Sequence, residues 1–132
     1  MRFLLDTDTC IYALKHREEV LQRLLAQSPA DVGISVITEA ELRTGAAKSA
    51  TPHKTLRRVE SFLGPLTVVE FTSTDAIAYA AVRGRLERAG TPIGPLDTLI
   101  AGQAVARKLV LVTNNEREFA RIPSLRLENW AR

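Results

Sequence analysis

The sequence has few of the residues that mark specialised protein classes. It contains one cysteine, Cys10, so it cannot form an internal disulfide, and a disulfide-rich secreted scaffold is excluded. Aromatic residues make up only 5% of the chain, which argues against a surface built to stack single-stranded bases. The most continuous apolar run, residues 76–82, is too short to span a bilayer, and the first ten residues do not resemble a signal peptide. We therefore expect a cytoplasmic protein with no membrane segment.

The rest of the composition is that of an average globular protein. The 132 residues are 45% apolar and 25% charged, and this length fits one domain spanning residues 1–132. Lys and Arg number 18 and Asp and Glu number 15, which gives a net charge of +3. This small excess permits a polyanionic partner without requiring one.

Short apolar runs alternate with helical patterns along the chain. The predicted strands cover residues 2–5, 32–36, 66–71, 109–112 and 125–127. Helices are predicted in two pieces between 11 and 25, broken near 15–17, and then over 38–47, 55–63, 74–89, 95–108 and 116–120. This alternation predicts a single α/β domain with a mainly parallel central sheet of about four to five strands flanked by helices.

Polar side chains follow the predicted strands at the edge where such sheets bind ligands. Asp6 comes directly after the first strand, Glu41 lies one turn into the helix after the second, and Asp97 lies in the first turn of the helix 95–108. Asn115 follows the fourth strand, with Glu116 and Glu118 just beyond it. Oxygen ligands that converge in this way suit Mg²⁺, which prefers octahedral oxygen coordination and keeps several waters.

Each acid also has an explanation that needs no metal. Thr38 and Glu41 have the spacing of a capping box, and Asp97 in a first turn complements the helix dipole. Asp6 or Asp8 are candidate helix caps, and Thr7 or Asp8 is the cap expected for the first helix. However, carboxylates among apolar residues are rarely buried without a partner, and one metal ion would serve several of them.

Four segments together resemble the PIN-domain ribonucleases of the toxin type found in bacterial VapBC toxin–antitoxin pairs. These segments are residues 3–8 (FLLDTD), 35–45 (SVITEAELRTG), 95–101 (PLDTLIA) and 111–119 (LVTNNEREF). The resemblance runs nearly end to end. None of the segments is specific for this family alone. Their order and spacing in a chain of this length together are a strong signal for it.

The resemblance implies that Asp6, Glu41 and Asp97 are catalytic and hold a metal ion, Mg²⁺ or Mn²⁺. It places the family's Thr or Ser near the fourth acid on Thr113. The implied reaction is hydrolysis of RNA phosphodiester bonds by a water molecule, leaving 5′-phosphate and 3′-hydroxyl ends. Carboxylates this close repel one another, so we expect one or more raised pKa values in the metal-free site.

The chain departs from the family pattern at two positions. Asp8 stands where the family often has Asn, and Asn115 stands where it often has a fourth Asp. An Asn carbonyl can ligate a metal but contributes no charge, which weakens the case for a second metal ion. Glu118 or Glu116 are the acids available to compensate.

The resemblance also implies the partners: an RNA substrate, tRNA in particular, a VapB-like antitoxin that covers the active site, and a second copy of the chain in a homodimer. A catalytically silent PIN-like module that binds RNA or protein remains the alternative, because of Asn115. A phosphoacceptor receiver domain is disfavoured, because Thr72 and Asn129 stand where it needs an Asp and a Lys.

Several other residues carry weaker predictions. Basic residues cluster at Lys48, Lys54, Arg57 and Arg58 and again at Arg83, Arg85 and Arg88. Each cluster is either a solvated helix face or a track for an RNA backbone. Cys10, Tyr12, Tyr79 and Trp130 are predicted in the core, and the two histidines lack the spacing of a zinc site.

Overall fold

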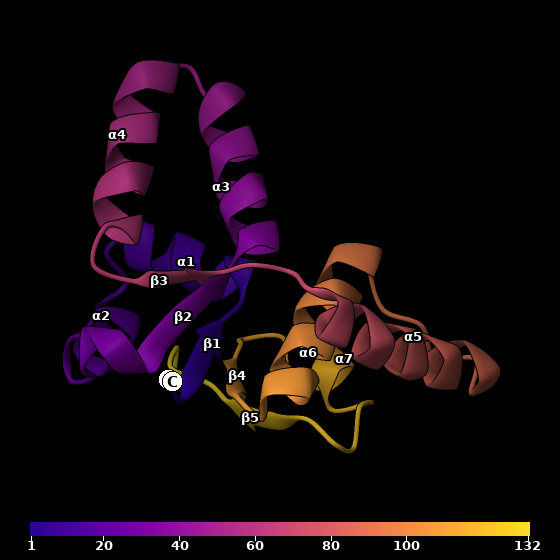
Figure 1. Ribbon diagram of the computed structural model, residues 1–132. Coiled ribbons are helices and arrows are strands. Elements are labelled where there is room, and N and C mark those ends of the chain that lie inside the picture. The colour runs from indigo at the N-terminus through magenta and orange to yellow at the C-terminus, as the bar shows by residue number, and fades with distance from the viewer.

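A computed structural model describes all 132 residues, and its centre is a sheet of five parallel strands (Figure 1). The strands are β1 (Phe3–Leu5), β2 (Val32–Ser35), β3 (Thr67–Val69), β4 (Val110–Val112) and β5 (Arg126–Glu128). Their order across the sheet is β3-β2-β1-β4-β5, so β1 is central. The predicted α/β class and parallel sheet are therefore confirmed.

Seven α-helices and one short 3₁₀ turn, Pro29–Asp31, connect the strands. The helices are α1 (Thr7–Leu14), α2 (Glu18–Leu25), α3 (Val36–Ala47), α4 (Pro52–Leu63), α5 (Ser73–Arg88), α6 (Pro95–Arg107) and α7 (Glu116–Phe119). In Figure 1, α3 and α4 form an antiparallel pair that stands out from one side of the sheet, and α5 and α6 lie together on the other side. None of the helices combines the length and the apolar character needed to cross a membrane.

The two faces of the sheet bury two separate apolar clusters. Leu4 of β1 packs on one side with Val82 of α5 and Ile100 of α6. Leu5 points to the opposite side and packs with Leu42 of α3. This alternation follows from the two-residue period of a strand. It explains why β1 is apolar along its whole length, since helices cover both faces.

The helix starts differ from the predicted ones for local reasons. Ser35 ends β2 and caps α3 by accepting a hydrogen bond from the Ile37 backbone N–H at 3.0 Å, so α3 begins at Val36, two residues before the predicted start at Thr38. Asp6, rather than Thr7 or Asp8, caps α1. The predicted strand 66–71 is limited to three residues.

Other predictions are confirmed by the packing. Gly90 has a φ of +71° just beyond α5, as expected of a glycine that ends a helix. Cys10 and Trp130 are buried, and the Trp130 ring packs edge-on against Phe3. Tyr12 is half-buried and packs against a small buried cluster of Ala13, Val20 and Ala131. Tyr79 is half-buried and belongs to none of the apolar clusters, so its placement in the core was wrong. The Tyr79 hydroxyl instead accepts a surface hydrogen bond from a neighbouring arginine.

Candidate active site

The central strands bring Asp6 and Thr113 to the same edge of the sheet. Asp6 follows β1 and Thr113 follows β4, and these strands pair directly, with Leu5 opposite Val112. The backbone N–H of Asp6 donates to the Val112 carbonyl at 3.0 Å and so extends the pairing by one residue. Parallel strands thus place the two side chains together, although more than 100 residues separate them in the sequence.

Asp6 lies at the bottom of this edge and is only 3% exposed. Its carboxylate caps α1 by accepting a hydrogen bond from the Thr9 backbone N–H at 2.8 Å. Burial raises its pKa, and the nearby charge of Asp8 raises it further, while hydrogen bonds from Thr113 and Thr9 oppose the rise. The carboxylate is therefore both a helix cap and a desolvated group open to a stronger electrostatic partner.

Glu41 reaches the site from the second turn of α3. Its Oε1 lies 2.7 Å from the Thr7 hydroxyl, which is also 3.1 Å from the Thr38 hydroxyl. Since a carboxylate only accepts, the Thr7 proton goes to Glu41. The capping box between Thr38 and Glu41 is wrong, because Thr38 lies inside the helix and Ser35 occupies the cap.

Asp97 lies in the first turn of α6 and is half-buried. Its pKa is raised to about 6, first by burial and then by the charges of Asp6, Glu41, Asp8 and Glu118. Four acids from three different segments therefore act on one carboxylate. The predicted rise in pKa is therefore found at Asp97, and the acids that cause it lie near enough to act on its charge.

The residues around the predicted fourth acid fall into two groups. Asn115 is half-buried at the start of α7 and its side chain does not cap that helix. Glu118 is half-buried and contributes to the charge felt by Asp97, whereas Asp8 does so from an exposed position. Glu116 faces elsewhere, because its carboxylate accepts hydrogen bonds from Asn129 and Arg132. Of the two acids considered as replacements for the fourth Asp, only Glu118 faces the site.

Glu41 stands between two open hollows. The inner hollow, of about 290 Å³, lies among α1, α3 and α4 and includes Leu14, Lys15 and Arg58. A second hollow, of about 450 Å³, extends from Glu41 toward Lys48 and Leu96. The site is therefore open to a long substrate from two directions.

The donor set suits a hard cation that retains water. All the charged donors are carboxylates, which Mg²⁺ and Mn²⁺ prefer. No three acidic, histidine or cysteine side chains are close enough together to enclose an ion by themselves. The mutual repulsion that raises the pKa of Asp97 is what a cation would relieve.

The sequence interpretation missed two threonines, Thr7 and Thr9, that hold the acids in place. Thr7 bonds to Glu41, and Thr9 bonds through its backbone to Asp6 and through its side chain to the Val112 carbonyl at 3.1 Å. Thr113, which the resemblance had indicated, accepts a hydrogen bond from the Asn115 backbone N–H at 2.8 Å. The available signal was the alternation of Asp and Thr in residues 6–9, which puts hydroxyls next to Asp6 and Asp8.

The PIN domain family matches residues 3–125. The chain belongs to the PIN-domain family. Among known PIN-domain proteins, the tRNA(fMet)-specific endonuclease VapC of Salmonella typhimurium is 44% identical over 130 residues, which cover 98% of each chain. Ribonuclease VapC2 of Rickettsia felis is 39% identical over 132 residues, again covering 98% of each chain.

A solved structure agrees with these sequence relationships. A crystal structure of DNA-bound VapBC from Salmonella typhimurium contains a chain that superposes with a TM-score of 0.94, at 44% identity and 98% coverage of both chains. Within the PIN-domain family the chain therefore groups with the VapC ribonucleases, as its resemblance predicted. Nucleases of this family depend on metal ions in general.

Proposed function

We propose that the protein is a VapC-like toxin, a Mg²⁺-dependent endoribonuclease that hydrolyses RNA phosphodiester bonds and that a cognate antitoxin inhibits. Mn²⁺ is the expected substitute for Mg²⁺. The observation that carries the proposal is the convergence of charge on Asp97, whose pKa of about 6 reflects burial and four acidic neighbours. Asp6, Glu41 and Asp97 form no ion pair within the chain, and carboxylates that repel one another in this way are suited to hold a divalent cation.

The roles follow from the position of each side chain. Asp6, Glu41 and Asp97 would hold the cation, and the bound ion would lower the pKa of a water molecule and polarise the phosphoryl oxygens. Thr7 fixes Glu41, and Thr113 hydrogen-bonds to Asp6. These residues keep the carboxylates oriented before substrate arrives.

The flanking residues have secondary roles in this proposal. Glu118 supplies part of the negative charge that Asn115 lacks, and Asp8 adds to it from the rim. Asn115 would offer a neutral carbonyl oxygen at the usual fourth-acid position. This distribution favours one firmly held ion over two.

The relatives suggest the substrate and partners. The Salmonella relative is named a tRNA(fMet)-specific endonuclease, and the solved VapBC structure joins such a toxin to its antitoxin. For the present chain we infer a tRNA substrate, a VapB-like antitoxin and a homodimeric toxin.

The test is cleavage of total tRNA by antitoxin-free protein with Mg²⁺, with EDTA and with Asp97→Asn. Discrete cuts that need both the metal and Asp97, and that leave 5′-phosphates, are expected. Glu87→Gln is the control, because Glu87 is an exposed acid paired with Arg83 on α5 and should leave cleavage unchanged. Cuts that persist in EDTA would contradict the proposed chemistry. Metal binding without any cleavage would favour the silent binding module.

A further inference from the structure

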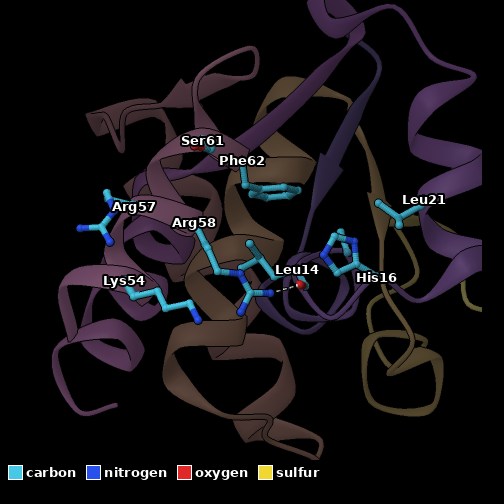
Figure 2. A pocket seen from close by; sticks show the side chains of 9 residues that line it. Leu14, His16, Leu21, Lys54, Arg57, Arg58, Ser61 and Phe62 are labelled. Atoms are coloured by element: carbon cyan, nitrogen blue, oxygen red, sulfur yellow. Dashed lines mark hydrogen bonds between the residues drawn. The ribbon is translucent and has the colours of Figure 1, made fainter. Parts of the chain in front are cut away.

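A groove runs between the junction of α1 and α2 and the exposed side of α4 (Figure 2). We call it the α4 groove. It encloses about 640 Å³. Its floor includes Leu14 and Phe62, and its rim carries His16, Lys54, Arg57 and Arg58. Lys54, Arg57 and Arg58 lie at helical spacings of three and four residues, so they form one stripe along α4.

The stripe is a concentration of uncompensated positive charge. No acidic residue lines the α4 groove. Arg58 donates to the Leu14 carbonyl at 2.7 Å, but Lys54, Arg57 and Arg58 form no ion pair within the chain, and all three are exposed. By contrast, Arg43 on α3 is paired with Glu39 at 2.8 Å and with Glu60 at 3.6 Å. The cations of the α4 stripe are therefore unpaired, whereas Arg43 on the neighbouring helix α3 is neutralised by acids.

The α4 groove adjoins the inner hollow, which reaches the proposed active site. It shares Leu14 and Arg58 with the inner hollow, and the inner hollow includes Lys15 and Glu41. A chain lying in the groove would pass along α4, over Arg58 and Lys15, and arrive at Glu41. The positive stripe thus lies beside the hollow that reaches the acidic site.

We propose that the α4 groove binds the phosphate backbone of the RNA substrate and guides it to Glu41. This inference rests on the proposed ribonuclease function and names the surface that holds its substrate. A polyanion fits because successive cations face it without an intervening acid. The half-buried Phe62 ring on the floor offers an aromatic surface to a base.

The second basic cluster provides a matched control. Arg85 and Arg88 are exposed on α5, and together with Arg121 they line a separate hollow of about 260 Å³. That hollow includes none of the proposed site residues. Removing two charges there changes the net charge by the same amount without touching the path to Glu41.

The experiment measures binding of labelled tRNA to antitoxin-free protein in EDTA by fluorescence anisotropy across a series of KCl concentrations. Lys54→Gln with Arg57→Gln is compared with Arg85→Gln with Arg88→Gln. A further variant, Ser61→Lys, adds a cation to the α4 groove, since Ser61 lines it. Thermal melts confirm that each variant is folded.

In the α4 double variant, the slope of the logarithm of the binding constant against the logarithm of the salt concentration should be shallower by about 1.4. This figure takes roughly 0.7 for each of two lost phosphate contacts. The electrostatic contribution of these two contacts vanishes near 1 M salt, so the loss of affinity at 0.1 M salt should be roughly 25-fold. The α5 variant should bind within about twofold of wild type, and Ser61→Lys should make the dependence steeper. In cleavage assays the α4 variant should raise KM while kcat is retained.

Equal binding by the two double variants would overturn the inference, as would an unchanged slope with Ser61→Lys. The inference would also be overturned if the α4 double variant lost affinity for polyglutamate but not for tRNA. The groove would then serve an acidic protein partner. These outcomes are separable from failure of the proposed function. If wild-type protein cuts no RNA with Mg²⁺, the function is wrong, while the binding series still reports on the groove.

Discussion

Asp97→Asn should stabilise the metal-free protein above pH 6. Burial and four acidic neighbours raise the pKa of Asp97 from 3.8 to about 6 in the folded state. The folded protein therefore binds this proton more tightly than the unfolded chain, so stability falls as pH rises from about 4 through 6. Asn does not titrate. The gain in free energy of unfolding of Asp97→Asn over wild type should be near zero at pH 4 and complete above pH 6.

The size of the effect follows from the pKa and the position of the side chain. At about 1.4 kcal/mol for each tenfold change in proton affinity, a rise from 3.8 to about 6 corresponds to at most about 3 kcal/mol. Asp97 is only half-buried, so solvent screening reduces this to roughly 1.5 kcal/mol. Loss of the interaction between the carboxylate and the dipole of α6 removes about 0.5 kcal/mol more. The net gain of about 1 kcal/mol should raise Tm by about 4 °C for 132 residues.

The assay is thermal unfolding of both proteins in EDTA from pH 4 to 8, repeated with Mg²⁺. Added Mg²⁺ should stabilise wild type more than Asp97→Asn and so narrow the difference. Asp75→Asn is the control of opposite sign. Burial opposes ionisation of Asp75, but hydrogen bonds from Arg107 and from the Thr72 backbone lower its pKa overall, so its loss should destabilise the protein at pH 7. A metal-free Asp97→Asn that melts below wild type at pH 7.5 would refute the reasoning.

Two further predictions concern packing and orientation. Gly102→Ala should lower Tm by about 4–10 °C, a loss of about 1–3 kcal/mol, because a Cβ there would lie 2.7 Å from the Tyr79 Cα. Gly45→Ala, whose Cβ meets nothing within 4 Å, should instead stabilise α3 by up to about 1 kcal/mol; equal melting of the two variants would contradict this. Thr7→Val should weaken Mg²⁺ binding about 10-fold in calorimetric titrations, because Glu41 loses the hydrogen bond that orients it. Thr7→Ser should restore binding, and an unchanged affinity in Thr7→Val would rule out that role.

The elements of the fold could be predicted where one strong local signal acts alone. The glycine after α5 and the proline at the start of α6 each mark a boundary within a residue of its true place. The start of α3 could not be placed this way, because Ser35 and Thr38 are both good caps and only β2 pairing decides between them. Likewise β3 is shorter than its apolar run, since strand length depends on the neighbour in the sheet.

The positions of Asp6 and Glu41 near one edge of the sheet could be predicted because β1 and β2 directly precede their segments, but the surroundings of these acids could not. Nothing local in the sequence indicates that Thr7 contacts Glu41, 34 residues away, or that Glu116 turns toward Arg132 while Glu118 faces Asp97. Those choices arise from packing between segments. The same holds for the basic clusters, because the α4 and α5 arginines look equivalent until the grooves beside them are seen.

The destabilised acids are held together by contacts at the far end of the helix that carries Asp97. On α6, Gln103 donates to the carbonyls of Val69 and Glu70 at 3.2 and 2.9 Å, and Arg107 pairs with the buried Asp75 at 3.0 Å. These bonds join α6 to the end of β3 and the start of α5. Because these bonds fix the far end of a rigid helix, they oppose a movement of its first turn that would relieve the repulsion around Asp97. The repulsion is thus retained in the folded state, where a divalent cation can relieve it on binding.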